Sequence, residues 1–227
     1  YWDLLTFQFI ENKQALKNEI DEWRRQVADL SNEDFITSSA EMMQRALLQT
    51  ANHLTEQEVV QHAKKITQDF IKTGVVINEA ITFLNSKAEE GHLCILSTGS
   101  YQSGAAGFLK ALVEAELISS TALDDIMISG AIVDWENKQL IHANVHNNKI
   151  KGLNNLLQSK RGFSLDPFSE NNAHEIYVYA DDPEGNDFGI LSLAVPENRF
   201  VIAHEKNQDA SDRLEYSRMT WNKKAIN

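Results

Sequence analysis

Residues 177–191 read YVYADDPEGNDFGIL, and this stretch decides how the rest of the sequence is interpreted. A short apolar run ends in Asp181 and Asp182, turns through proline and glycine, and meets a third acid, Asp187, before a helical pattern begins. Carboxylates gathered at the end of a buried strand repel one another, and a cation, commonly Mg²⁺, usually makes such a cluster tolerable. In open α/β sheets that edge is also where ligands bind. The alternative is that Asp, Pro, Gly and Asn simply form a turn here.

The composition limits the classes of function. The chain has 227 residues, of which 42% are hydrophobic and 24% charged, as in ordinary globular proteins. Its length allows one large domain or two small ones. The formal net charge of −12 argues against nucleic acid or an anionic membrane as a partner, because both require clustered Lys and Arg.

Apolar stretches and cysteine usage indicate the cellular compartment. No apolar stretch approaches the roughly 20 residues that span a bilayer, and we see no signal-peptide pattern. The single cysteine, Cys94, lies in an apolar run, which excludes an intrachain disulfide and predicts a buried thiol. We therefore expect a cytoplasmic protein, while a translocated or secreted protein without disulfides stays open.

Residues 1–90 are expected to form a helical segment. An apolar stripe at three- and four-residue spacing predicts the first amphipathic helix. Ser31 has the features of a helix N-cap, and Thr55 with Glu58 forms a capping-box pattern. The stripe consists of Leu16, Ile20, Trp23, Val27 and Leu30.

Residues 91–227 change character and predict a parallel, wound α/β sheet, because strand-length apolar runs alternate with helical patterns. Two alternating runs joined by a polar turn predict a hairpin near 126–145. The other expected elements are strands at 92–97, 175–180 and 199–203, a helix at 148–158, and a final helix through Leu214 and Tyr216.

The stretch STGSYQSGAAG, residues 97–107, lies between a predicted strand and a predicted helix, where backbone amides can hold a phosphate. Ala105 replaces the lysine of a P-loop, and Tyr101 replaces the second glycine of the dinucleotide fingerprint. The hydroxyls of Ser97 and Thr98 and the amides around Gly99 suit one phosphoryl group. An ordinary strand-to-helix turn is the alternative.

Lys149 and Lys151 lie at the start of a predicted helix, where a positive charge opposes the helix macrodipole. A lysine that points into an acidic, phosphate-bearing site would explain this position, and a solvated surface lysine is the alternative for each. His142 and His146 lie four residues apart without a carboxylate pattern, so we expect no zinc site. The G-x-S-x-G pattern of serine hydrolases is absent.

Taken in order, these segments resemble the haloacid dehalogenase-like (HAD) superfamily, in the branch typified by phosphoserine phosphatase. CILSTGS fits the Ser/Thr motif, with Ser97 in the slot and Thr98 beside it, and KIKGLNNLL supplies Lys149 as the family's lysine. YVYADDPEGNDFGILSLA fits the last motif, with Asp181 as the metal-binding acid and Asp187 as the second acid. The resemblance implies a Rossmannoid parallel sheet flanked by helices, with an inserted helical cap at 1–90 and an α/β core at 91–227.

The sequence departs from the family pattern at three places. Ala180 stands where the family usually has glycine, and the gap from Asp181 to Asp187 is about two residues longer than usual, so Asp182 can share or take the metal role. The D-x-D-x-T motif that carries the nucleophile is missing, and YWDLLTFQFIE resembles the start of the first cap helix, which comes after that motif in the family. We expect the first strand and its aspartates upstream of residue 1; the alternative is a protein that has lost its nucleophile.

The resemblance implies a Mg²⁺-dependent phosphatase that acts through an aspartyl-phosphate intermediate. Ser97, Lys149 and Asp187 are its expected catalytic residues, Thr98 and Gly99 add phosphate contacts, and Asp181 or Asp182 binds the metal. The expected substrate is a small phosphomonoester or a phosphorylated protein side chain, and the oligomeric state is not predicted. The first alternative is an inactive HAD-like binding or regulatory module, and a weaker one is a nucleotide-binding α/β protein.

Overall fold

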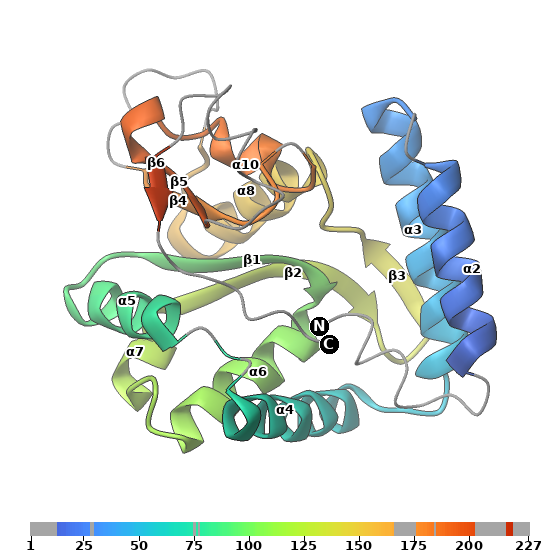
Figure 1. Ribbon diagram of the computed structural model, residues 1–227, viewed down its shortest axis with the longest axis horizontal. Helices are drawn as coiled ribbons and strands as arrows, with labels where there is room; N and C mark the ends of the chain where they lie inside the picture. The colour runs from blue at the N-terminus through green and yellow to red at the C-terminus, as the bar shows by residue number, and fades with distance from the viewer. Residues whose placement is uncertain are drawn as a thin grey trace.

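The computed structural model describes residues 13–27, 30–74, 76, 78–165, 176–183, 185–202 and 217–219. These residues form a mixed α/β structure, as expected, with helices packed around two small sheets (Figure 1). The first sheet has the order β1–β2–β3 and the second β4–β5–β6. The strands are β1 (Cys94–Tyr101), β2 (Ile126–Asp134), β3 (Gln139–His142), β4 (Val178–Ala180), β5 (Arg199–Ile202) and β6 (Ser217–Met219).

Within each sheet the pairing is mostly parallel. β1 pairs with β2 in parallel, and β2 and β3 form the antiparallel hairpin predicted near 126–145. β4, β5 and β6 pair in parallel. The sequence predicts one wound sheet, whereas the described strands form two, because no described strand joins β1 to β4.

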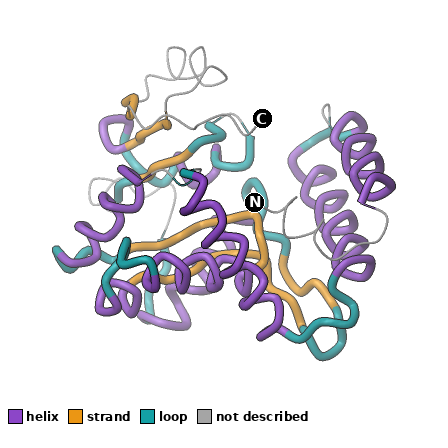
Figure 2. Tube along the Cα trace, turned by 60° about the horizontal axis from the view of Figure 1, so that its bottom comes forward, coloured by secondary structure: helices purple, strands orange, loops and turns teal. Residues whose placement is uncertain are grey.

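The helices begin where the sequence signals predict. Ser31 caps α3 (Asn32–Thr50) by accepting from the Asp34 amide, and the Thr55–Glu58 capping box opens α4 (Glu56–Thr73). Gly74 ends α4 with a left-handed φ of 69°, which glycine adopts without strain. The hairpin of α2 (Lys13–Gln26) and α3 stands at one side of the molecule, where α3 lies next to β3 (Figures 1 and 2).

The next helices pack on one face of the first sheet. α4 approaches α6 (Gln102–Glu114) so closely that a Cβ on Gly107 would overlap the Val60 carbonyl and the Ala63 side chain. α5 (Asn78–Glu89) contacts β1 and α7 (Ser120–Asp125). α5 therefore lies against β1 and α4 lies against α6, whereas α3 lies beside β3 at the edge of the same sheet.

Alternating side chains show that β1 and β4 occupy one layer. In β1, Leu96 packs into a cluster with residues of α5, α6 and α7, whereas Ile95 packs against α8 (Asn148–Arg161). In β4, Val178 packs into the same α8 cluster, while the Tyr179 ring contacts Phe83 of α5 at a centroid distance of 4.8 Å. The same two helices thus cover both strands, one on each face.

The last part of the chain is only partly described. The acidic turn after β4 leads into α10 (Phe188–Leu191), which is a single helical turn, and η1 (Pro196–Asn198) precedes β5. The helix predicted through Leu214 and Tyr216 lies outside the described residues. Among the helices that the structure describes, none has the length and apolar character needed to cross a bilayer.

Candidate functional site

A buried ion pair joins the predicted lysine motif at the start of α8 to the predicted acidic motif after β4. Lys149, in the first turn of α8, is 4% exposed, and its Nζ contacts Oδ1 of Asp187, which is 7% exposed. The carboxylate thus offsets the unfavourable position of a lysine at a helix N-terminus. The surface-lysine interpretation is wrong for Lys149 and holds for Lys151, which is exposed.

The acidic turn is built around the other oxygen of Asp187. Its Oδ2 accepts hydrogen bonds from the backbone amides of Asp181 and Asp182, each at 3.3 Å. Asp182 in turn closes the loop, since its Oδ2 accepts from the Asn186 amide at 2.9 Å and its carbonyl from the Asp187 amide at 3.1 Å. A Cβ on Gly185 would overlap the Asp182 carboxylate, so a larger residue there would have to displace the side chain that closes the turn.

The turn interpretation of this segment is therefore correct for part of it only. Asp182, Gly185 and Asn186 form the turn, but Asp187 is a buried group paired with a lysine from another element. Asp181 is half-buried directly after β4.

The hydroxyl slot lies at an irregularity of β1 rather than at the end of the strand. β1 and β2 stay in register up to the Ser97–Ser129 pair, and the pairing resumes at Tyr101 and Ala131, so β1 advances four residues while β2 advances two. The predicted turn after Ser97 is thus wrong: the strand continues to Tyr101 and bulges at residues 98–100.

The two candidate hydroxyls have different surroundings. The Thr98 Oγ1 accepts from the Ser100 amide at 3.1 Å and so takes part in the local hydrogen bonding of the bulge. The Ser97 Oγ is buried and has no hydrogen-bond partner among the described residues. Such a hydroxyl can meet water or a ligand, and the described residues hold four more of them, in Ser39, Ser100, Ser103 and Ser129. The geometry favours Ser97 as the hydroxyl that can meet a phosphoryl oxygen.

Asn144 is a site residue that the sequence reasoning missed. It is fully buried, and its Nδ2 donates to the Thr98 carbonyl and to the Ser129 carbonyl, each at 2.8 Å. The available signal is an asparagine between the apolar residues Ala143 and Val145 at the end of a predicted strand, because buried amides need partners.

The loop that contains Asn144 brings the two strand ends together. Asn144 bonds Thr98 in the irregular part of β1, and Lys149, five residues later, bonds Asp187 beyond β4. Residues 143–149 therefore connect the irregular part of β1 to the turn after β4. In open α/β sheets, ligands bind beyond the carboxyl ends of the strands.

His146 lies in the same loop and has a left-handed backbone, with a φ of 49°. Its ring contacts Phe35 of α3 edge-on, at a centroid distance of 5.0 Å. Burial lowers the pKa of the imidazole; the nearby Asp182 charge raises it, and the Lys149 charge lowers it. A left-handed non-glycine residue commonly marks a functional site.

Mg²⁺ fits the acidic turn only in part. Within the described ranges, no group of three His, Cys, Asp or Glu side chains is placed to hold a metal ion. Asp187 is committed to Lys149, and Asp182 to its own turn. Asp181 follows β4 directly and is half-buried, and the described residues by themselves form no complete metal shell.

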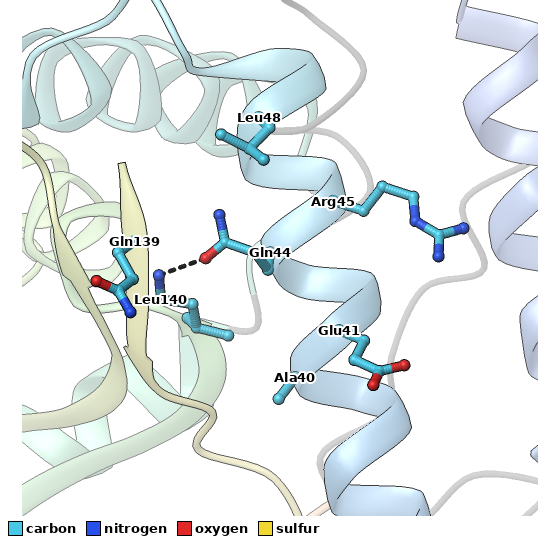
Figure 3. Close-up of a pocket in the computed structure, with 7 residues that line it drawn as sticks. All are labelled: Ala40, Glu41, Gln44, Arg45, Leu48, Gln139 and Leu140. Carbon is cyan, nitrogen blue, oxygen red and sulfur yellow. Dashed lines mark hydrogen bonds between the residues drawn. The ribbon is translucent and has the colours of Figure 1, made fainter. Parts of the chain in front are cut away.

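The groove shown in Figure 3 is separate from these residues. It has a volume of about 540 Å³ and lies between α3 and β3. Gln44 spans its wall: its Oε1 accepts from the Leu140 amide at 2.6 Å, and its Nε2 donates to the Lys138 carbonyl at 2.9 Å. The groove is lined by Ala40, Glu41, Gln44, Arg45, Leu48, Gln139 and Leu140.

Comparison of the chain with family models, with curated proteins and with solved structures gave no match. The geometry of the residues themselves is therefore the basis for a functional proposal.

Proposed function

We propose that this protein is a Mg²⁺-dependent phosphatase of the HAD type, which hydrolyses a phosphomonoester through an aspartyl-phosphate intermediate. The observation that carries the proposal is the buried contact of Lys149, in the first turn of α8, with Asp187, in the turn after β4. Burying two charges costs several kcal/mol per ion by rough estimate, and such pairs are a weak source of net stability. A functional use of the lysine explains why the pair is kept.

In this proposal the phosphoryl group lies between β1 and the start of α8. Ser97 donates a hydrogen bond to one phosphoryl oxygen, and the Thr98 and Gly99 amides stand near the same place. Lys149 neutralises charge on the transferred group, and Asp187 holds the ammonium in position. Donors and cations placed in advance are the main source of rate enhancement in phosphoryl transfer.

The broken sheet supports the expected position of the nucleophile. β1 and β4 share helices α5 and α8 on their two faces, yet no described strand lies between them. We propose that a further parallel strand, expected upstream of residue 1, occupies this position and carries the nucleophilic aspartate at its carboxyl end. Such a strand would be covered on both faces, so its residues would be apolar.

Mg²⁺ would be held by Asp181 together with oxygens of the nucleophile strand and of the substrate. When bound, the ion would neutralise phosphoryl charge in the attacking complex. Because the described residues form no complete metal group, the roles given to Ser97, Lys149 and Asp187 do not depend on the ion.

The test is hydrolysis of p-nitrophenyl phosphate, with and without Mg²⁺, by the polypeptide that the complete gene encodes. We expect Mg²⁺-dependent turnover, and a loss of about 10²–10³ in kcat for Ser97→Ala, the scale of one lost oxyanion donor. Asp181→Asn should abolish both turnover and its Mg²⁺ dependence, whereas Asp124→Asn, at an exposed acid, should change neither. Undiminished Mg²⁺-dependent turnover in the Asp181 variant would refute the role of that residue.

A second candidate function is a binding or regulatory module that keeps the site without catalysis. The lack of a three-ligand metal group among the described residues favours it. This module would bind inorganic phosphate in a manner that depends on Ser97 and Lys149. It would not hydrolyse p-nitrophenyl phosphate, whichever metal ion is added. The assay above separates the two functions.

A further inference from the structure

We infer that Asn144 is a positioning residue, which sets the shape of the phosphoryl-binding part of β1 without touching the phosphoryl group. The inference rests on the proposed function, because that function supplies the phosphoryl ligand. The positioning role itself is argued from the hydrogen bonds of the Asn144 side chain. Nothing in the family resemblance assigns a role to this position.

Asn144 bridges the two strands at the irregularity of β1. Beyond Ser97 the register of the two strands shifts, since β1 advances four residues to Tyr101 while β2 advances two to Ala131. The Asn144 amide group has two N–H donors, and the carbonyls of Thr98 and Ser129 each lie 2.8 Å from its nitrogen. The side chain thus ties β1 to β2 at the point where their register shifts, and so fixes the separation of the strands at the bulge.

The other side of the same amide faces α8. A Cβ on Gly152 would lie 2.5 Å from the Asn144 Oδ1 and 2.8 Å from the His142 Nε2, so the helix comes as close as glycine permits. Gly152 is three residues beyond Lys149, on the same helix. Asn144 therefore sets two distances together: that between the strands, and that between the strands and the helix that carries the lysine.

These distances decide whether the donors converge. Ser97 lies directly before the bulge, Thr98 and Gly99 lie within it, and Lys149 approaches from α8. Preplaced donors lose their advantage when they shift by a fraction of an ångström, since the transition state is bound by their fixed arrangement. A buried amide that fixes the arrangement from behind thus controls affinity without contacting the ligand.

The test compares three variants of the polypeptide from the complete gene. Asn144→Asp keeps the shape and replaces two donors by acceptors, and Asn144→Ser keeps one donor. Asn154→Asp is the matched control: it makes the same change on α8, where the Asn154 side chain donates to the Leu165 carbonyl at 2.9 Å and accepts from the Leu165 amide at 2.8 Å.

Two readouts are needed, both at a temperature where each variant is folded. Hydrogen exchange of the amides of residues 98–100, without ligand, reports the shape of the bulge. The dissociation constant for inorganic phosphate, by titration calorimetry, reports the effect on the site. We expect faster exchange at 98–100 in both Asn144 variants. We also expect their affinity for phosphate to be about tenfold weaker or more, the scale of one hydrogen bond lost between a displaced donor and the charged phosphate. The Asn154 variant should lose stability but keep both values.

Each outcome decides between the two proposals. Unchanged exchange at 98–100 in the Asn144 variants would overturn the inference, and so would changed exchange with wild-type phosphate affinity. If Asn144→Asp does not fold, the serine variant decides by the same criteria. A wild-type protein that binds no phosphate would overturn the proposed function, and the inference with it, whereas phosphate binding without turnover would overturn only the phosphatase.

Discussion

Removing one partner of the buried ion pair should destabilise the protein far more than removing a surface charge. Lys149→Met keeps most of the side-chain volume and deletes the charge. Asp187 would then lie 7% exposed with no cationic partner. Breaking a buried pair by removing one member typically costs about 3–5 kcal/mol, because the remaining charge is uncompensated.

The structure indicates the lower end of that range. Asp187 would keep the hydrogen bonds from the Asp181 and Asp182 amides, which partly satisfy its carboxylate. We therefore expect a loss of about 3 kcal/mol in the free energy of unfolding. The double variant Lys149→Met with Asp187→Asn should lose only about 1 kcal/mol, because the neutral amide still accepts these bonds and no charge stays buried.

The assay is urea unfolding at neutral pH, followed by fluorescence, with the slope and midpoint analysed together. Lys72→Met is the matched control, since Lys72 pairs with Asp69 at 3.6 Å and is 75% exposed. Exposed pairs contribute only about 0–1 kcal/mol. A Lys149→Met variant that loses no more than the Lys72 control would refute the reasoning, because the lysine would then be solvated. Equal losses for the single and double variants would also refute it.

The remaining predictions concern Gly152 in α8, His146 in the loop before that helix, and the buried thiol of Cys94. Gly152→Ala should lower stability by about 1–3 kcal/mol through overpacking against Asn144, measured by urea unfolding; a gain of about 1 kcal/mol, the helix-propensity expectation, would contradict the packing. His146 has a pKa below its ordinary value, so the unfolded state binds the proton more tightly. Stability should therefore fall as the pH drops from 7.5 through about 6.5, the unfolded pKa, and the loss should level off below the folded pKa. His146→Phe should reduce this loss and the exposed control His53→Gln should not; identical pH slopes in wild type and His146→Phe would contradict the prediction. Burial raises the pKa of the Cys94 thiol, so iodoacetamide should modify it only after unfolding, and rapid labelling of the native protein would show that the residue is accessible.

Local signals in the sequence predict local structure well. The N-cap at Ser31 and the capping box at Thr55 are confirmed, as is the hairpin near 126–145. Each of these features depends on a few neighbouring residues whose hydrogen bonds close within one turn. The same holds for Cys94, whose burial follows from the apolar run around it.

Features that depend on distant residues are predicted less well. The sequence predicts a turn at 98–100 where the structure has a bulge, because glycine and serine are typical of both, and the distinction depends on Asn144, about 45 residues further on. The described strands form two sheets, and the single wound sheet stays a prediction because it depends on which strands pair. No periodicity of one segment contains that information. The helical cap at 1–90 and the metal roles of Asp181 and Asp182 stay predictions.

The broken sheet and the buried pair have a common physical consequence. Lys149 belongs to α8, which packs on β1 and β2, whereas Asp187 follows β4. At the other end of the break, Ile95 and Val178 share one apolar cluster on the same helix. The described parts of the two sheets are therefore joined by an apolar contact within the layer and by an ionic contact at the edge that we propose to bind the ligand. A phosphoryl group that binds Lys149 must share the ammonium with Asp187, so ligand binding and the joining of the two sheets act on the same charge.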